Sequence, residues 1–378
     1  MNYIKVLDDI FKQFEGPRFG VRLWDGKTTY YGKFGNPSFT LYITKPSVVK
    51  RLLAEGALGF GESYMDGTLD IEGSLEGYLK LRHQNKHVKS SLRLVMAKFW
   101  AELSKPKNRE GQISYHYDLG NDFFSLFLDK ETMSYSGAHF LSKNDTLGVA
   151  QQNKLELVCE WMNLPKGSQV LDLGSGWGGF AIHAAKNYGW NIHGKTLSNK
   201  QLKYCKILIS QHVLEKEISI KYQDFTSINT DQIYDGAVMI EAIEHVGKND
   251  LETFLSSISN HLPAGAPFYL QFTGRYKSKL VDPWTLKYVF PGGHLPAKQE
   301  FLEAAEKSGF VIEKFEDHTE DYKKTMSLWI NSIELNQNTI EKIFDTDFFR
   351  LWKLWTHGAH VNFEIGDMSL FRVLLRKP

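Results

Sequence analysis

A glycine-rich turn at the end of an apolar run limits the fold of this chain more than any other feature. Residues 170–179 read Val-Leu-Asp-Leu-Gly-Ser-Gly-Trp-Gly-Gly, and an alanine-rich stretch, Ala181–Lys186, follows. This pattern is typical of a buried strand, a tight turn and a helix, with backbone amides exposed where a ligand can approach closely. It predicts an α/β protein with a doubly wound, Rossmann-like sheet.

Alternating apolar and helical segments continue this pattern from residue 112 to the C-terminus. Such alternation indicates a largely parallel sheet with helices on both faces. For the last of the expected strands, the sequence leaves both a parallel and an antiparallel pairing with the sheet open. These strands are Val170–Leu173, Asn191–Lys195, Ile218–Tyr222, Tyr234–Ile240, Phe268–Phe272, Phe310–Phe315 and Ser369–Leu375.

Two kinds of cofactor are compatible with the glycine turn. Gly174, Gly176 and Gly179 satisfy the G-x-G-x-x-G pattern of dinucleotide sites, which also need an acid after the next strand to hold a ribose. The strand Asn191–Lys195 is followed by Thr-Leu-Ser instead, and the acid is Asp172, inside the first motif. Because D-x-G-x-G is the pattern of S-adenosylmethionine (AdoMet) sites, we expect AdoMet and not a dinucleotide.

Polar and aromatic residues after the second and third strands extend the predicted AdoMet site. Hydroxyl and amide groups after the second strand can bond the ribose, and an Asp-Phe pair after the third can accept from the adenine amino group and cover the ring. The residues assigned to these contacts are Thr196, Leu197, Ser198, Gln201, Asp224 and Phe225.

The fourth strand ends in a cluster of titratable residues. Glu241, Glu244 and His245 follow it, and ligands of open α/β sheets lie beyond the carboxyl ends of the strands. A carboxylate there is either a base or a residue that orients a ligand.

Two upstream segments, Tyr115–Phe127 and Met133–Phe140, place aromatic rings beside polar groups. Such rings suit a sulfonium or a carbocation through cation–π attraction.

Length, charge and cysteine content exclude several classes of protein. At 378 residues the chain is long for one domain. Its net charge of +1 gives no electrostatic reason to expect nucleic acid, and its two cysteines lack metal-ligand spacing. The N-terminus lacks the pattern of a signal peptide, and no stretch approaches the ~20 apolar residues of a membrane span. We expect a soluble cytoplasmic protein without a metal.

The composition of the chain changes near residue 105. We expect an N-terminal α+β domain over residues 1–104, a linker over 105–112 and a catalytic domain over 113–378. In the N-terminal domain the expected elements are two strands, Thr28–Gly32 and Ser38–Thr44, a helix, Val48–Ala54, and a loop, Gly59–Gly67.

A basic amphipathic segment, Tyr78–Arg109, closes the N-terminal domain. It holds nine lysines and arginines against one acid, Glu102, with apolar residues between them. Such a segment suits an anionic membrane surface, although a solvated helix face fits the same pattern. The residues predicted to contact a membrane are Lys80, Arg82, Lys86 and Lys89.

Seven motifs occur in one order along the chain, and together they resemble the cyclopropane-fatty-acyl-phospholipid synthase family, which is related to the mycolic acid cyclopropane synthases. The motifs are Y-H-Y-D-L-G-N-D-F-F, M-S-Y-S-G, V-L-D-L-G-S-G-W-G-G, T-L-S-N-K-Q, I-E-H-V-G, D-P-W…Y-V-F-P-G-G-H-L-P and D-Y-K-K-T. The resemblance implies a class I AdoMet-dependent methyltransferase fold with a smaller lipid-binding N-terminal domain. It also implies transfer of a methylene from AdoMet across the cis double bond of unsaturated phospholipid acyl chains, by a peripheral homodimer at the inner membrane face.

The resemblance further implies site residues. Tyr117, Tyr135 and Ser136 join the AdoMet contacts. Methyl transfer to an alkene leaves a carbocation, so a base must remove a proton from the new methyl group. In the family a bound bicarbonate is this base, beside a glutamate and a tyrosine that correspond to Glu244 and Tyr322, with His245 also catalytic. The residues assigned to bicarbonate are Gly137, Glu244, Gln271, Thr273 and Tyr322.

The chain departs from the family pattern at three positions. Gly137 and Ala359 stand where members usually have cysteine, and Gln271 where some have histidine. Without a cysteine nucleophile an acid–base route is favoured, with the Gly137 amide holding part of the bicarbonate. A methyltransferase of the same fold that makes a methyl-branched lipid, or that methylates a small amine, stays the main alternative. The complete D-x-G-x-G motif with Glu244 and Tyr322 argues against a non-catalytic lipid-binding protein.

Overall fold

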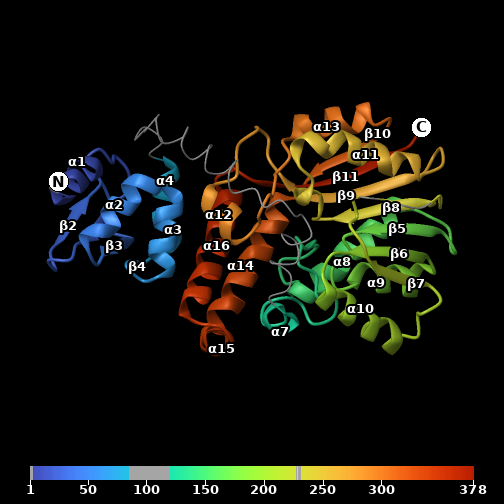
Figure 1. Cartoon of the computed structure of the whole chain (residues 1–378), viewed down its shortest axis with the longest axis horizontal. Helices are drawn as coiled ribbons and strands as arrows, with labels where there is room; N and C mark the ends of the chain where they lie inside the picture. Colours follow the sequence, from blue (N-terminus) through green and yellow to red (C-terminus); the bar gives the residue numbers. More distant parts are fainter. Residues whose placement is uncertain (1–2, 85–119, 227, 229–230) are drawn as a thin grey trace. The chain divides into compact units, whose positions relative to one another are not determined.

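The computed structural model describes residues 3–84, 120–226, 228 and 231–378 of the chain (Figure 1). These residues form two compact units. Unit 1 begins at the N-terminus and also takes in Asp282–Val289 and Ile333–Ile365, and unit 2 contains the remainder. The expected linker at 105–112 lies outside the described residues, so the predicted domain boundary stays a prediction. Within the described ranges no helix has both the length and the hydropathy that crossing a bilayer requires.

Unit 2 is built on a seven-stranded sheet with the order β10-β11-β9-β8-β5-β6-β7. The strands from β7 to β9 are parallel, and β11 is antiparallel to both of its neighbours. All seven predicted strands and the doubly wound, Rossmann-like arrangement are thereby confirmed. The strands are β5 (Gln169–Leu173), β6 (Asn191–Thr196), β7 (Ile218–Tyr222), β8 (Gly236–Ile240), β9 (Pro267–Gly274), β10 (Val311–Asp317) and β11 (Ser369–Arg376).

Helices cover both faces of this sheet (Figure 1). Successive strand residues point to opposite faces, so Val170 packs in one buried cluster and Leu171 in the other. Because both faces are closed, a ligand can approach only at the ends of the strands. One face carries α8 (Leu147–Met162), α9 (Gly179–Tyr188) and α10 (Asn199–Gln211), and the other carries α11 (Leu251–Asn260) and α13 (Lys298–Lys307). The other helical segments in this part of the chain are α7 (Asn121–Phe124), the 3₁₀ turns η1 (Ile243–His245) and η2 (Lys248–Asp250), and α14 (Thr319–Leu335).

Unit 1 contains a four-stranded sheet with the order β2-β1-β3-β4. The two predicted strands and the predicted helix at Val48–Ala54 are confirmed. The strands are β1 (Phe19–Arg22), β2 (Thr28–Tyr31), β3 (Phe39–Ile43) and β4 (Leu69–Gly73). The helices are α1 (Tyr3–Phe11), α2 (Pro46–Glu55), α3 (Ala57–Met65), α4 (Leu75–Gln84), α12 (Pro283–Tyr288), α15 (Gln337–Ile343) and α16 (Thr346–Glu364).

The loop predicted at Gly59–Gly67 is wrong, because α3 occupies most of it. The two glycines that suggested a turn serve close helix packing instead. A Cβ on Gly59 would lie 2.6 Å from the backbone oxygen of Arg51, and one on Gly61 would lie 2.2 Å from Cδ1 of Trp284. Glycine is therefore needed here for the approach of α2 and α12 to α3.

Candidate active site

The candidate site lies where the strand order of the large sheet changes direction. The chain passes from β5 to β6 on one side and later returns to place β8 on the other side of β5, which is where open α/β sheets bind ligands. A pocket opens at the carboxyl ends of these strands. Nine predicted cofactor residues line it: Tyr135, Ser136, Asp172, Gly174, Gly176, Thr196, Leu197, Gln201 and Phe225.

The glycine turn leaves room for a ligand along the floor of the pocket. Gly174 and Gly176 both have positive φ, at 86° and 53°, and the space that a Cβ on Gly176 would enter is empty to beyond 4 Å. Asp172 is fully buried beside them, and its Oδ2 has no hydrogen-bond partner among the described residues. Burial raises the pKa of Asp172 to about 7. A buried carboxylate oxygen without a partner calls for a donor from a ligand, so these residues fit the amino and ribose groups of AdoMet.

Three other predicted cofactor residues do not line the pocket or cannot be placed. Ser198 accepts a hydrogen bond from the backbone N of Gln201 at 3.3 Å and so caps α10. Asp224 accepts from the backbone N and Oγ1 of Thr226 at 2.8 and 2.7 Å and so stabilises a turn. Tyr117 lies outside the described residues. The roles of all three in AdoMet binding stay predictions.

Aromatic rings form part of the pocket wall. Tyr135, Trp177, Phe180 and Phe225 line it, and Tyr135 stacks on Trp329 with ring centroids 5.2 Å apart. Such rings attract a cation held over their faces. The wall therefore suits both a sulfonium and a carbocation, as expected from the sequence.

The carboxylate of Glu241 accepts three hydrogen bonds at this edge of the sheet. Its Oε1 accepts from the backbone N of Gly137 at 2.7 Å and from Nε2 of Gln271 at 2.8 Å. Its Oε2 accepts from the hydroxyl of Tyr322 at 2.7 Å. Burial raises the pKa of Glu241, while these three donors and the charge of Lys154 act in the opposite direction. Glu241 also lines the pocket, so its carboxylate lies between the cofactor space and the three donors.

Glu244 has different partners, although it is only three residues away. Its Oε1 accepts from the backbone N of Thr273 at 2.6 Å, and its buried Oε2 has no hydrogen-bond partner in the part of the chain that the structure describes. Burial, and secondly the charge of Glu241, raise the pKa of Glu244 to about 8. The carboxylate of Glu241 therefore accepts hydrogen bonds from more residues than that of Glu244 does. His245, predicted as catalytic, lines the pocket.

Lys154 contributes a buried amine on the opposite wall. It is 1% exposed, and its Nζ donates to Oγ of Ser136 at 2.7 Å. Gln151, one turn earlier on α8, donates its Nε2 to the backbone oxygen of Ser136 at 2.8 Å. Burial lowers the pKa of Lys154 to about 8, against the attraction of Glu241 and Asp129. These bonds hold the Tyr-Ser-Gly segment against α8.

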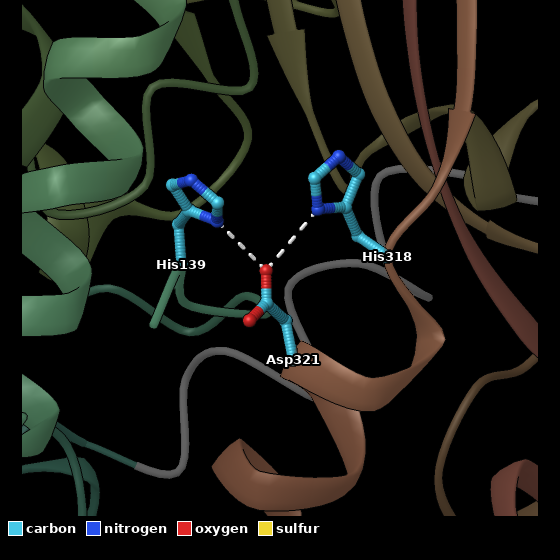
Figure 2. A group of neighbouring side chains, drawn as sticks. All are labelled: His139, His318 and Asp321. Carbon is cyan, nitrogen blue, oxygen red and sulfur yellow. Dashed lines mark hydrogen bonds and ion pairs between the residues drawn. The ribbon is translucent and has the colours of Figure 1, made fainter. Parts of the chain in front are cut away.

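A charged cluster lies behind Gln271. One oxygen of Asp321, Oδ2, lies 2.8 Å from Nδ1 of His139 and 3.2 Å from Nδ1 of His318 (Figure 2). The guanidinium of Arg372 is fully buried beside them, with Nη1 3.0 Å from Nδ1 of His318 and 3.4 Å from Asp321. Although burial acts to raise it, these hydrogen bonds keep the pKa of Asp321 well below its usual range. A cation thus already neutralises this carboxylate, which gives the cluster a structural role and not that of a metal site.

Comparison with known proteins shows the family. A family model described as mycolic acid cyclopropane synthetase matches residues 104–373, and a domain of unknown function matches residues 6–92. The cyclopropane-fatty-acyl-phospholipid synthase of Escherichia coli K12 is 32% identical over 350 residues, which cover 91% of this chain and 89% of that protein. The chain belongs to the cyclopropane synthase family. The resemblance read from its motifs is confirmed.

Two further similarities bear on this family member. A probable fatty acid methyltransferase of Pseudomonas putida is 27% identical over 376 residues, 95% of this chain and 91% of that protein. The crystal structure of the mycolic acid cyclopropane synthase CmaA1 with S-adenosylhomocysteine matches with a TM-score of 0.67 and 27% identity, over 72% of this chain and 99% of that one. The class I methyltransferase fold and the use of AdoMet are thereby supported, and the chain is an AdoMet-dependent methyltransferase of the cyclopropane synthase family.

Some residues of this cyclopropane synthase family member gain their importance only from the structure. The sequence predicts that Glu241 lies near the cofactor, but it does not show that Gly137, Gln271 and Tyr322 donate to Glu241, because the family resemblance assigns them to bicarbonate. Lys154 and Arg372 were not singled out. The sequence indicates that both residues are buried. Lys154 is four residues from Ala150 and Val158, so it lies on the same buried face of α8, and Arg372 interrupts an apolar strand. Ala359, the second position where members usually have cysteine, lies on α16 in unit 1.

Two of the four predicted membrane contacts can be placed. Lys80 pairs with Glu364 at 2.5 Å within unit 1, so part of its charge is already neutralised. Arg82 is exposed. Lys86 and Lys89 lie outside the described residues, and contact with a membrane stays a prediction for all four.

Proposed function

We propose that the protein is a cyclopropane-fatty-acyl-phospholipid synthase, which adds a methylene from AdoMet across the cis double bond of an unsaturated phospholipid acyl chain. The observation that supports this most is a buried, hydrogen-bonded carboxylate, Glu241, on the wall of an aromatic cofactor pocket. An alkene is a weak nucleophile, and its methylation leaves a carbocation that must lose a proton. The pocket offers rings for the cation and a carboxylate for the proton.

Each part of the pocket has a place in this function. AdoMet, when bound, supplies an electrophilic methyl group. Asp172 and the glycine turn would hold its polar end, while Tyr135 and Phe225 would face its sulfonium and adenine. The buried walls exclude water, which would otherwise capture the carbocation as an alcohol.

Isotope labelling tests this function directly. The protein is incubated with AdoMet that carries a trideuterated methyl group and with vesicles of dioleoyl phospholipids. Cyclopropanation removes one deuteron, so we expect acyl chains with two deuterons that take up no hydrogen on mild catalytic hydrogenation. Chains or head groups that retain all three deuterons would overturn the proposal, since simple methyl transfer breaks no C–H bond of the methyl group.

A methylene-branched chain, the unsaturated form of a methyl-branched lipid, is the second candidate, because one relative is named as a probable fatty acid methyltransferase. After a hydride shift in the carbocation, loss of a proton from the new methyl group gives this =CH2 branch. The chains would again hold two deuterons but would take up hydrogen on hydrogenation. The same experiment therefore separates the two products, and both need a base at the position of Glu241.

A further inference from the structure

The carboxylate of Glu241 accepts hydrogen bonds from residues that the family resemblance assigns to a bound bicarbonate. Gly137, Gln271 and Tyr322, three of the five residues of that assignment, all donate to Glu241 at 2.7–2.8 Å. A carboxylate and a bicarbonate present the same planar pair of acceptor oxygens. A bicarbonate beside an ionised Glu241 would also be repelled by its charge. The chain thus provides, in the side chain of Glu241, the anion that these donors bind.

The backbone at Glu241 supports a role for its side chain. Glu241 has φ of +50°, a conformation that favours glycine and that is costly for a residue with a side chain. Its backbone N donates to the oxygen of Gln271 at 2.7 Å, which ties it to β9. Residues kept in this conformation concentrate at functional sites. The uncommon backbone conformation thus occurs at the residue whose carboxylate binds the three donors.

Gly137 allows the donors to come this close. A Cβ at this position would lie 2.6 Å from Cδ2 of Leu370 and 3.2 Å from the ring of Tyr322. The ring of Tyr322 therefore packs directly over the backbone of residue 137, with its hydroxyl 2.7 Å from Glu241. The glycine that replaces the usual cysteine is thus part of the same arrangement.

Arg372, which lies beside the cluster of Figure 2, orients the third donor. Arg372 donates its Nε to Oε1 of Gln271 at 2.9 Å and its Nη2 to the oxygen of Ala138 at 2.9 Å. An amide that accepts through its oxygen must present its nitrogen on the other side. Nε2 of Gln271 accordingly faces Glu241 and also donates to the oxygen of Gly137 at 2.9 Å. Arg372 and Asp321 act as positioning residues in this arrangement.

We propose that Glu241 is the catalytic base of this enzyme and that the reaction needs no bound bicarbonate. This inference rests on the proposed function. The AdoMet methyl bonds to one alkene carbon as S-adenosylhomocysteine leaves, and the other alkene carbon becomes cationic. A C–H bond of the new methyl then breaks, its electron pair closes the ring onto the cationic carbon, and the proton moves to Glu241. Glu241 returns the proton to water when the product leaves.

Turnover of Glu241 variants, measured with and without added anions, tests the proposal. In buffer depleted of carbon dioxide, the wild type should methylate dioleoyl phosphatidylglycerol vesicles as fast as with 20 mM bicarbonate, within about twofold. Glu241→Gln keeps the shape of the side chain and should lose roughly 10²-fold or more in kcat, the usual scale for a positioned base, with or without bicarbonate. In Glu241→Gly the glycine tolerates the positive φ, and the three donors lose the carboxylate that they bind. Bicarbonate or formate should therefore restore part of the kcat of this variant, whereas chloride should not. Glu320→Gln, at an exposed carboxylate on α14, is the matched control.

A binding measurement keeps the test independent of turnover. Carbon-13 NMR of labelled bicarbonate, with S-adenosylhomocysteine present, should show binding to Glu241→Gly and none to the wild type. Bicarbonate that binds the wild type as well as the variant, or a wild-type rate that collapses without bicarbonate, would overturn the proposal. If the wild type transferred no methyl group to any vesicle, the proposed function would fail, while the binding result would still decide whether Glu241 fills the anion site.

Discussion

Arg372 fixes the orientation of Gln271 through one hydrogen bond, from its Nε to Oε1 at 2.9 Å. Both side chains are fully buried, so no bulk water can replace this bond. The amide nitrogen of Gln271 then faces Glu241. The bond links the charged cluster around Asp321 to the proposed base.

Replacing Arg372 with leucine should damage both stability and turnover. The free energy of unfolding should fall by about 3–5 kcal/mol, because Asp321 loses the buried cation beside it. Turnover should fall at saturating AdoMet, since Gln271 can then rotate, while the KM for AdoMet changes little. The double variant Arg372→Leu with Asp321→Asn should regain stability but not kcat, measured by denaturant unfolding and steady-state kinetics. Full kcat in the single variant would show that Gln271 needs no such support.

Asp172 should destabilise the protein when no AdoMet is bound. Its pKa rises from 3.8 to about 7 on folding, so the folded state binds an extra proton between these values. The bound proton therefore stabilises the folded state at low pH, and this stabilisation is lost as the pH rises through 7. Asp172→Asn should therefore be more stable than the wild type above pH 7, by up to about 4 kcal/mol, with a smaller gain toward pH 4. Thermal unfolding at pH 4.5 and 8 measures this, and calorimetry should show weakened AdoMet binding; an equal gain at both pH values would contradict the raised pKa.

Lys154 should set the lower pH limit of the reaction. Burial raises the pKa of Glu241, and the positive charge of Lys154 opposes that rise. Lys154→Met removes the charge, so the acid limb of the kcat profile should move to higher pH. The profile is recorded between pH 5 and 8 at saturating AdoMet, with the exposed Lys166→Met as control. An unmoved acid limb would show that the two groups do not interact.

The fold of unit 2 could be predicted because its central strands are nearly continuous apolar runs, as is typical of strands buried on both faces. β5 and β8 illustrate this, since every residue of each is buried apart from one at an end. The prediction failed at α3, because the segment Gly59–Gly67 was expected to form a loop. Local sequence cannot show that Trp284, more than 200 residues later, occupies the space beside Gly61.

The chemistry of the site was only partly predictable for a similar reason. Glu241 and Glu244 are three residues apart, and nothing local decides which one receives the donors. The choice depends on Gly137, Gln271 and Tyr322, at sequence separations of 104, 30 and 81 residues. It also depends on the positive φ of Glu241, which turns the two carboxylates to different partners.

Gly61 should tolerate no side chain. Gly61→Ala places a Cβ 2.2 Å from the Trp284 ring, and we expect a loss of about 1–3 kcal/mol from overpacking. Gly358→Ala is the matched control in unit 1, since α16 leaves open space at that glycine. The control should gain about 0.5–1 kcal/mol from helix propensity. Denaturant unfolding of the full chain compares the two, and equal stability would mean that α3 and Trp284 separate easily.

The basic segment should bind anionic membranes unequally along its length. Lys80 is paired with Glu364, whereas Arg82 is exposed. We therefore expect Arg82→Gln to weaken binding to phosphatidylglycerol vesicles by about 1 kcal/mol and Lys80→Gln to weaken it less. Co-sedimentation at two salt concentrations tests this, because screening should weaken the wild type as well. Binding that neither salt nor Arg82→Gln changes would mean that this segment is only a solvated face.

The packing of α16 within unit 1 has a consequence for biosynthesis. Arg350 on α16 donates to the backbone oxygen of Leu69, 281 residues earlier, and bonds Asp70 at 2.9 Å, while α16 also lies against α3 and α4. At ribosomal rates of about 5–20 residues per second, α3 and α4 wait roughly a quarter of a minute to a minute for this partner. During that time their apolar faces stay uncovered on the nascent chain. The N-terminal residues of this enzyme are therefore made first but complete their folding late, and a chaperone bound in that interval would protect them.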